Sequence, residues 1–203
     1  FRSRFDVSNT WTRVNEIRKH PRYNSDTYDY DFAVLKLSGW FQHDKVRLND
    51  SISSPQVGEA LTILGFGGQS TTLKEGRVNY VSPSVCVEKW LLAGYLIDED
   101  AAICAKDEDG TVDACTGDSG GPLLLAQNRR RSPTQVGVIS SGSGCDGRLP
   151  TVYSRVSAGL DWIEEQTCKL SASPPTSCKG NHSSNDVQNE TKIRVDIKLD
   201  DYP

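Results

Sequence analysis

A glycine-rich decapeptide at residues 113–122 limits the possible folds and functions of this chain more than any other segment. It reads Asp-Ala-Cys-Thr-Gly-Asp-Ser-Gly-Gly-Pro and leads into an apolar run. Glycines let the backbone turn sharply and bring N–H groups close to a ligand. A serine on such a turn, Ser119, exposes its hydroxyl beside backbone donors, which are the parts of a nucleophile with an oxyanion hole. The alternative is a glycine-rich loop whose serine has no chemical role.

The composition argues against two classes of partner. The chain has 203 residues and a formal net charge of −4, and no basic face dominates, so a nucleic-acid partner is not expected. The basic run at residues 129–131 is interpreted as a solvated loop. Since no apolar stretch reaches the roughly 18 residues that cross a bilayer, no membrane span is expected either.

Six cysteines occur without metal-ligand spacing, so we expect disulfides and neither a metal site nor a cofactor. They are Cys86, Cys104, Cys115, Cys145, Cys168 and Cys178. An even number of cysteines without a metal pattern favours an oxidising compartment and a secreted, extracellular protein. Triplets that begin at Asn49, Asn181 and Asn189 fit the N-glycosylation acceptor and agree with a secreted glycoprotein.

Short apolar or alternating runs, separated by turn residues, predict an all-β barrel or sandwich. The runs lie at residues 13–18, 32–37, 60–67, 77–81, 101–105, 122–126, 135–140 and 153–156. One helix is expected near residues 158–167, with Ser157 as its N-cap. The polar segment at residues 41–59 is interpreted as a connection between two halves.

The composition changes after Cys168. Residues 169–190 are rich in Ser, Pro and Asn and are interpreted as a linker. Apolar residues then stand at every second position from 193 to 199, which predicts that residues 191–203 begin a C-terminal β module. Because the chain begins at Phe1, contains no Met and ends inside this periodic stretch, we expect a fragment of a longer protein.

Four motifs, in order and with the right spacing, resemble those of chymotrypsin-like (trypsin-type) serine proteases across residues 1–168. Residues 117–122 resemble the nucleophile motif, and Asp31 with the run that follows is similar to the strand that carries the catalytic acid. Residues 140–145 and 150–153 resemble the two walls of the specificity pocket, and residues 161–163 resemble the C-terminal helix. The resemblance implies two six-stranded antiparallel β-barrels, the first incomplete, and a C-terminal helix. It also implies a serine endopeptidase whose partners are protein or peptide substrates and protein inhibitors.

The resemblance assigns roles to individual residues. Ser119 would be the nucleophile, and the N–H groups of Gly117 and Ser119 would form the oxyanion hole. Asp31 would orient the general-base histidine; Asp29 is the alternative, but Asp31 directly precedes the apolar strand, as in the family motif. Asp118 would pair with a newly freed N-terminus on activation.

None of the three histidines has the sequence context of the family's general base. His20 resembles a family segment that follows the base, His43 lies in the polar connection, and His182 lies in the linker. We therefore expect the base to be missing with an N-terminal part of the protease domain. This chain alone is accordingly expected not to hydrolyse peptides.

The resemblance places Asp113 at the base of the specificity pocket, where a carboxylate selects Lys or Arg by charge-assisted hydrogen bonding. The alternative is a loop aspartate among acidic neighbours. Ser140 and Gly142 would line the substrate site. Thr151 stands where the family usually has Gly, and its branch would narrow the slot and favour Lys or a smaller residue over Arg. Ser141 replaces a Trp of the groove wall.

The cysteines also fit the family. The resemblance implies the bridges Cys86–Cys104 and Cys115–Cys145. Cys168 either pairs with Cys178 or with a cysteine upstream of this chain. A further family bridge is replaced by two leucines, at positions 61 and 125, which should form an apolar contact.

Two functional hypotheses stay open. The first is an active trypsin-like endopeptidase that forms an acyl-enzyme. The second is a non-catalytic protease homologue that acts as a binding or inhibitory protein. Ser141 and Thr151 favour the second, whereas the joint presence of Asp31, Ser119 and Asp113 favours the first, because binding alone would not require the nucleophile.

Overall fold

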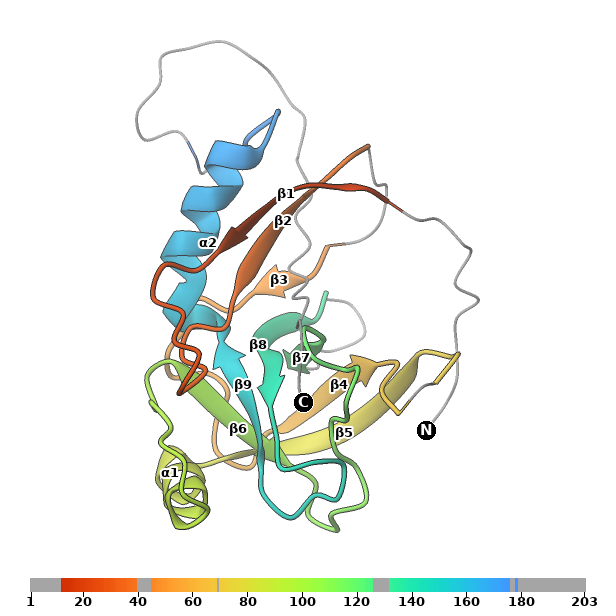
Figure 1. The fold of residues 1–203 in the computed structure, drawn as a ribbon, viewed down its shortest axis with the longest axis vertical. Helices are drawn as coiled ribbons and strands as arrows, with labels where there is room; N and C mark the ends of the chain where they lie inside the picture. The colour runs from red at the N-terminus through yellow and green to blue at the C-terminus, as the bar shows by residue number, and fades with distance from the viewer. Residues whose placement is uncertain (1–11, 40–44, 69, 126–131, 176–177, 179–203) are drawn as a thin grey trace.

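The computed structural model describes residues 12–39, 45–68, 70–125, 132–175 and 178, and this part is mostly β (Figure 1). The strands are β1 (Val14–Lys19), β2 (Ala33–Leu37), β3 (Arg47–Leu48), β4 (Ala60–Gly65), β5 (Lys74–Val81), β6 (Ala102–Lys106), β7 (Pro122–Leu125), β8 (Thr134–Ser141) and β9 (Thr151–Arg155). The helices are α1 (Pro83–Leu92) and α2 (Val156–Leu170).

Six strands close into an antiparallel barrel in the order β8-β7-β4-β5-β6-β9, because β9 pairs with β6 on one side and with β8 on the other. Along β5, Gly76, Val78 and Tyr80 are buried and alternate with more exposed residues, as expected for a strand with one face on a core. The barrel interior is filled by aliphatic and aromatic side chains, among them Leu61, Leu123 and Tyr153. The predicted strands of this half are confirmed, with boundaries that differ by a few residues.

The two leucines that replace a family disulfide lie opposite each other. Leu61 of β4 pairs with Leu125 of β7 in the antiparallel register. Leu61 is 1% exposed, and Leu125 packs against the same barrel core. An apolar contact therefore stands at this position, as the sequence predicts.

The N-terminal half differs from the barrel. Here β1 and β2 form a separate two-stranded antiparallel sheet that lies along α2 (Figure 1). Phe32 and Val34 on the β2 side pack against Val156 and Ile163 of α2 in a second core. The short strand β3 joins β8 in parallel and so belongs to the barrel sheet. The described residues thus contain one closed barrel, and the expected first barrel is represented in them by β1 and β2.

The helices correct two sequence predictions. The C-terminal helix was predicted, but it begins at Val156 with Arg155 as N-cap, so the prediction that Ser157 caps it was wrong. The reason is that β9 runs directly into α2, and the Arg155 N–H donates to the carbonyl of Ala101. The all-β prediction also missed α1, whose signal in the sequence is Ser82 as N-cap followed by a proline at the first helical position.

Several predictions fall wholly or partly outside the described residues. These concern the basic run 129–131, the linker at 169–190 apart from 169–175 and 178, the β module at 191–203, and His43 and His182. Within the described part, α2 continues to Leu170, two residues past the expected domain boundary. None of the helices described is both long and apolar enough to cross a membrane.

The first candidate glycosylation site is inaccessible in the folded chain. Asn49 is 4% exposed, and its Nδ2 donates hydrogen bonds to the carbonyls of Ser51 and Ser54. A glycan would have to be attached to this same nitrogen, so the folded structure contradicts the use of this triplet. Asn181 and Asn189 lie outside the described residues.

Candidate active site

Ser119 lies on a tight turn just before β7. Gly117 and Gly120 have φ values of 95° and 80°, a region that side chains rarely adopt. The turn is tied to β8, because Gly120 N–H donates to the carbonyl of Ile139 and Ile139 N–H donates to the carbonyl of Gly121. The glycines therefore let the loop fold back on the barrel and leave Ser119 half-buried at its surface.

Two backbone N–H groups in the Ser119 turn have no hydrogen-bond acceptor among the described residues. Within the described residues, the N–H groups of Gly117 and Ser119 donate to no protein acceptor, whereas those of Asp118, Gly120 and Gly121 donate to carbonyls. Two N–H groups of one turn that have no protein acceptor can donate hydrogen bonds to a negatively charged oxygen.

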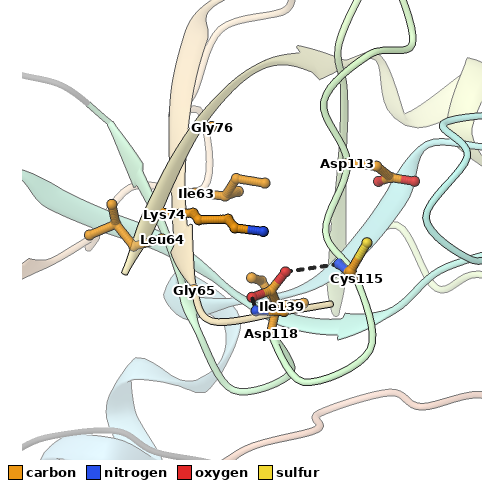
Figure 2. Close-up of a pocket in the computed structure, with 10 residues that line it drawn as sticks. Ile63, Leu64, Gly65, Lys74, Gly76, Asp113, Cys115, Asp118 and Ile139 are labelled. Carbon is orange, nitrogen blue, oxygen red and sulfur yellow. Dashed lines mark hydrogen bonds between the residues drawn. The ribbon is translucent and has the colours of Figure 1, made fainter. Parts of the chain in front are cut away.

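The carboxylate of Asp118 turns away from this surface and into the end of the barrel. It accepts hydrogen bonds from Gly67 N–H at 2.5 Å and from Cys115 N–H at 2.9 Å. A side chain at position 65 or 67 would displace this carboxylate, because a Cβ on Gly65 or Gly67 would lie 1.8 or 2.2 Å from one of the Asp118 carboxylate oxygens. Beside Asp118 lies a cavity of about 60 Å³ (Figure 2).

Asp31 is buried next to the same region. It is 5% exposed, and the Ser140 hydroxyl donates to its Oδ2 at 2.8 Å. Burial raises the pKa of Asp31, while the Ser140 hydrogen bond and the charge of Lys19 act in the opposite direction. Since Ser140 follows Ile139, which bonds to the Ser119 turn, the fold brings Asp31 and Ser119 onto adjacent segments.

The carboxylate of Asp113 is already engaged. Its Oδ1 accepts from Ala114 N–H and from the Thr151 hydroxyl, and its Oδ2 accepts from Gly147 N–H. Thr151 Oγ1 lies 3.6 Å from the position that a Cβ on Gly142 would occupy. The structure therefore brings Asp113, Gly142 and Thr151 together, with the threonine hydroxyl bound to the carboxylate.

The comparison with known proteins agrees with this geometry. A family model described as Trypsin matches residues 3–163. The chain belongs to the trypsin family. The relatives that the chain resembles are trypsin-type serine proteases, so the chain has the fold of a peptidase family.

Three trypsin-family relatives are each 34% identical to the chain. They are trypsin 5G1 of Aedes aegypti over 169 residues, transmembrane protease serine 7 of Mus musculus over 172 residues and coagulation factor XII of Rattus norvegicus over 171 residues. The matches cover 75%, 77% and 76% of this chain and 59%, 20% and 28% of the respective relatives. The chain therefore spans less than two thirds of each of these proteins.

The histidine that the structure describes is not placed as the base of a trypsin-family site. His20 stacks on Tyr30 with ring centroids 4.8 Å apart and contacts the edge of Trp162. Its Nδ1 accepts from Arg22 N–H, and burial together with the Arg22 charge lowers its pKa. No hydrogen bond among the described residues links His20 to Asp31. His20 therefore has a structural role, as its sequence context indicates.

Three disulfides hold this trypsin-family domain. They are Cys86–Cys104, Cys115–Cys145 and Cys168–Cys178. The first two are the pairs that the resemblance implies, and the third is one of the two alternatives left open for Cys168. The second joins the Ser119 loop to the segment that follows β8.

The sequence reasoning did not single out Lys74, which lines the cavity beside Asp118 (Figure 2). Its signal was the alternation along β5: Lys74 stands in phase with Gly76 and Val78, which are buried. A lysine at an inward-facing position of a strand requires an explanation. Across the described residues, no three His, Cys, Asp or Glu side chains are grouped so that they could hold a metal ion.

Proposed function

We propose that this chain is part of a serine endopeptidase that cleaves peptide bonds through an acyl-enzyme at Ser119. The observation that carries the proposal is that the N–H groups of Gly117 and Ser119, in the same glycine turn, have no acceptor among the described residues. Ser119 Oγ attacks the substrate carbonyl carbon and gives its proton to a general base, and the carbonyl oxygen receives the negative charge between the two N–H groups. The amine leaves with a proton, and water then releases the acyl group.

Asp31 acts through the general base. Ionised carboxylates accept several hydrogen bonds, and Asp31 uses Oδ2 for Ser140, so an imidazole N–H can bind the remaining acceptor capacity. His20 is held among aromatic rings, and His43 and His182, which lie outside the described residues, lack the sequence context of the family's base. We therefore propose that the 203-residue chain alone does not hydrolyse peptides.

Labelling with a fluorophosphonate tests the nucleophile. A longer protein that contains this chain and a histidine upstream should be labelled, and Ser119→Ala should abolish the label. Ser84→Ala, a change on exposed α1, should leave it intact. The 203-residue chain should show no label and no cleavage of fluorogenic peptides. Serine-dependent turnover by the 203-residue chain would contradict its proposed inactivity, and a label on the longer protein that survives Ser119→Ala would contradict the nucleophile.

The pocket selects a basic residue before the scissile bond, with Lys preferred over Arg. Asp113 attracts a cation, but Ala114, Gly147 and Thr151 already donate to it. Arginine binds a carboxylate best through two parallel hydrogen bonds, whereas lysine binds as a point charge. The narrowed slot and the occupied carboxylate therefore disfavour the longer, two-pronged side chain.

Substitutions at Thr151 distinguish the steric effect of its methyl branch from the effect of its hydrogen bond to Asp113. Thr151→Ser keeps the donor and removes the methyl branch, and Thr151→Val keeps the shape and removes the donor. We expect Thr151→Gly to raise the Arg-to-Lys ratio of kcat/KM by roughly tenfold, about 1.4 kcal/mol of discrimination. Cleavage after Arg as fast as after Lys by the unaltered protein would contradict the proposal.

The second candidate is a non-catalytic homologue that binds or inhibits. It is favoured by the engagement of Asp113 with Thr151, which reduces the capacity of the pocket for a cation. A protein extended upstream that binds peptides, yet neither reacts with fluorophosphonate nor cleaves, would support this candidate over the first.

We propose an extracellular setting for either function. Three disulfides in a chain of this size are typical of oxidising compartments. The partners are then protein or peptide substrates and protein inhibitors that bind at Ser119.

A further inference from the structure

Lys74 begins β5 at a position that faces the interior of the barrel end. In the antiparallel register, Lys74 pairs directly with Gly65 of β4. It is half-buried and lines the same cavity as Asp118, and Figure 2 shows its side chain extending into that cavity. The neighbouring Glu75 is exposed, as expected for the opposite face of the strand.

The carboxylate of Asp118 takes the place of a side chain on Gly65. An ideal Cβ on Gly65 would lie 1.8 Å from Asp118 Oδ1. Directly opposed residues on antiparallel strands have their Cβ atoms about 4.5–5.5 Å apart, and opposite charges at such positions attract. Asp118 therefore stands, from another loop, where the cross-strand partner of Lys74 would stand.

We propose that Lys74, alongside the freed N-terminus expected to pair with Asp118 on activation, is a positioning residue that holds Asp118 inward by its charge and so keeps the Gly117 and Ser119 N–H groups directed to substrate. The inference rests on the proposed oxyanion hole. Asp118 connects these N–H groups along the chain, and its carboxylate is fixed by Gly67 and Cys115. A cation on the cavity side neutralises a carboxylate whose two described hydrogen bonds both come from backbone N–H groups.

Asp118, rather than Asp113, is the acid that pairs with Lys74 in this proposal. Both acids line the cavity. Asp113, however, directs its oxygens to Thr151, Gly147 and Ala114. Asp118 lies on the Gly65 position opposite Lys74 and is the acid next to the nucleophile.

A double-mutant cycle on the 203-residue chain tests the pair without requiring peptidase activity. Lys74→Met, Asp118→Asn and the double variant are compared by urea unfolding. We expect coupling of about fivefold or more in the unfolding equilibrium constant. Arg77→Met removes a positive charge from the exposed face of the same strand and should show no coupling to Asp118→Asn. Additive effects at Lys74 and Asp118 would overturn the proposal.

Amide hydrogen exchange provides a local readout. The Gly67 and Cys115 N–H groups are protected through Asp118, so Lys74→Met should make them exchange about tenfold faster, and Arg77→Met should not. Added propylammonium should restore slow exchange in Lys74→Ala, whereas the uncharged propanol should not. Equal rescue by propanol would show that Lys74 only fills space and would overturn the proposal. If Lys74→Met and Lys74→Ala do not fold, Lys74→Gln replaces them as the uncharged variant.

The complete endopeptidase gives the functional readout. Lys74→Met should lower kcat roughly tenfold with little change in KM, because the oxyanion hole acts in the transition state. If fluorophosphonate labelling of Ser119 fails while Lys74 and Asp118 remain coupled, the proposed function is wrong and the pairing stands. If Ser119 is labelled but Lys74 and Asp118 are not coupled, the proposed function stands and the pairing of Lys74 with Asp118 is wrong.

Discussion

In the closed barrel, the carboxylates of Asp113 and Asp118 accept three and two hydrogen bonds within the described residues, whereas the carboxylate of Asp31, at the entrance to β2, accepts one. The barrel donors include backbone N–H groups of loops fixed by the barrel itself. The single donor to Asp31 is the side chain of Ser140. Burial is accordingly the largest influence on the pKa of Asp31 and raises it.

The number of hydrogen bonds to each carboxylate shows which part of the site is fixed by the barrel alone. The turn around Ser119 and the pocket around Asp113 are held by contacts within one barrel. Asp31 reaches that barrel from the two-stranded sheet and is left with acceptor capacity for a partner, which the proposed function assigns to the histidine. We therefore expect changes in the barrel to cost stability, and changes at Asp31 to behave in the opposite way.

The largest expected effect is loss of the disulfide across the pocket. Cys115–Cys145 closes a separation of 30 residues, and replacing both cysteines by serine should lower the free energy of unfolding by about 4 kcal/mol. Cys168–Cys178 closes a separation of 10 residues at the end of α2, and its removal should cost less, about 2–3 kcal/mol. Urea unfolding without reductant measures both. A larger loss at Cys168–Cys178 would reverse the comparison.

The next effect concerns the space that Gly65 leaves for the Asp118 carboxylate. Gly65→Ala should destabilise the chain by about 3 kcal/mol, because the new methyl group overlaps Asp118 Oδ1 and forces the carboxylate off its backbone donors. Gly142→Ala is the matched control, since its Cβ would make an ordinary contact at 3.6 Å. Urea unfolding should show less than about 1 kcal/mol for the control. Equal losses of stability in Gly65→Ala and Gly142→Ala would mean that the close packing around the Asp118 carboxylate does not contribute to stability.

Asp31→Asn should have the opposite sign. A buried acid with a raised pKa is disfavoured in its charged form, so its cost to stability appears as pH rises from the ordinary value of 3.8 through the raised pKa. At pH 7, the variant should therefore be more stable by on the order of 1 kcal/mol, and the gain should vanish toward pH 3. Asp118→Asn, compared in the same urea titrations, should be destabilising. Stabilisation by both variants would remove the contrast between the two regions.

The smallest effect is a pH dependence from His20. Burial and the Arg22 charge lower its pKa, so the folded chain holds His20 neutral while the unfolded chain takes up a proton near pH 6.5. Stability is thus lost as pH falls below about 6.5 toward the lowered pKa. The Tm of the unaltered chain should fall by a few degrees more between pH 7 and pH 5 than that of His20→Phe. Parallel Tm curves for the two proteins would refute this role.

Patterns of short range in the sequence were enough to predict most of the fold. Alternation and turn residues located the barrel strands, and the positions of Leu61 and Leu125 identified an apolar pair that β4 and β7 place opposite each other. These predictions worked because strand periodicity depends on near neighbours in the chain. Helix α1 was missed because its apolar residues are not confined to one face: Cys86 and Trp90 are buried, whereas Val85, Leu91 and Leu92 are exposed.

Tertiary structure decided the features that join distant residues. The acceptor triplet at Asn49 matches a glycosylation signal in the sequence, but folding buries its amide nitrogen against Ser51 and Ser54. The sequence placed Thr151 in the pocket but could not show that its hydroxyl donates to Asp113, 38 positions away. Ser119 and its glycines were visible in the sequence alone, because a turn is a local structure. The position of the Asp118 carboxylate opposite Lys74 was not visible in the sequence, because it arises only where β4, β5 and the Ser119 loop meet.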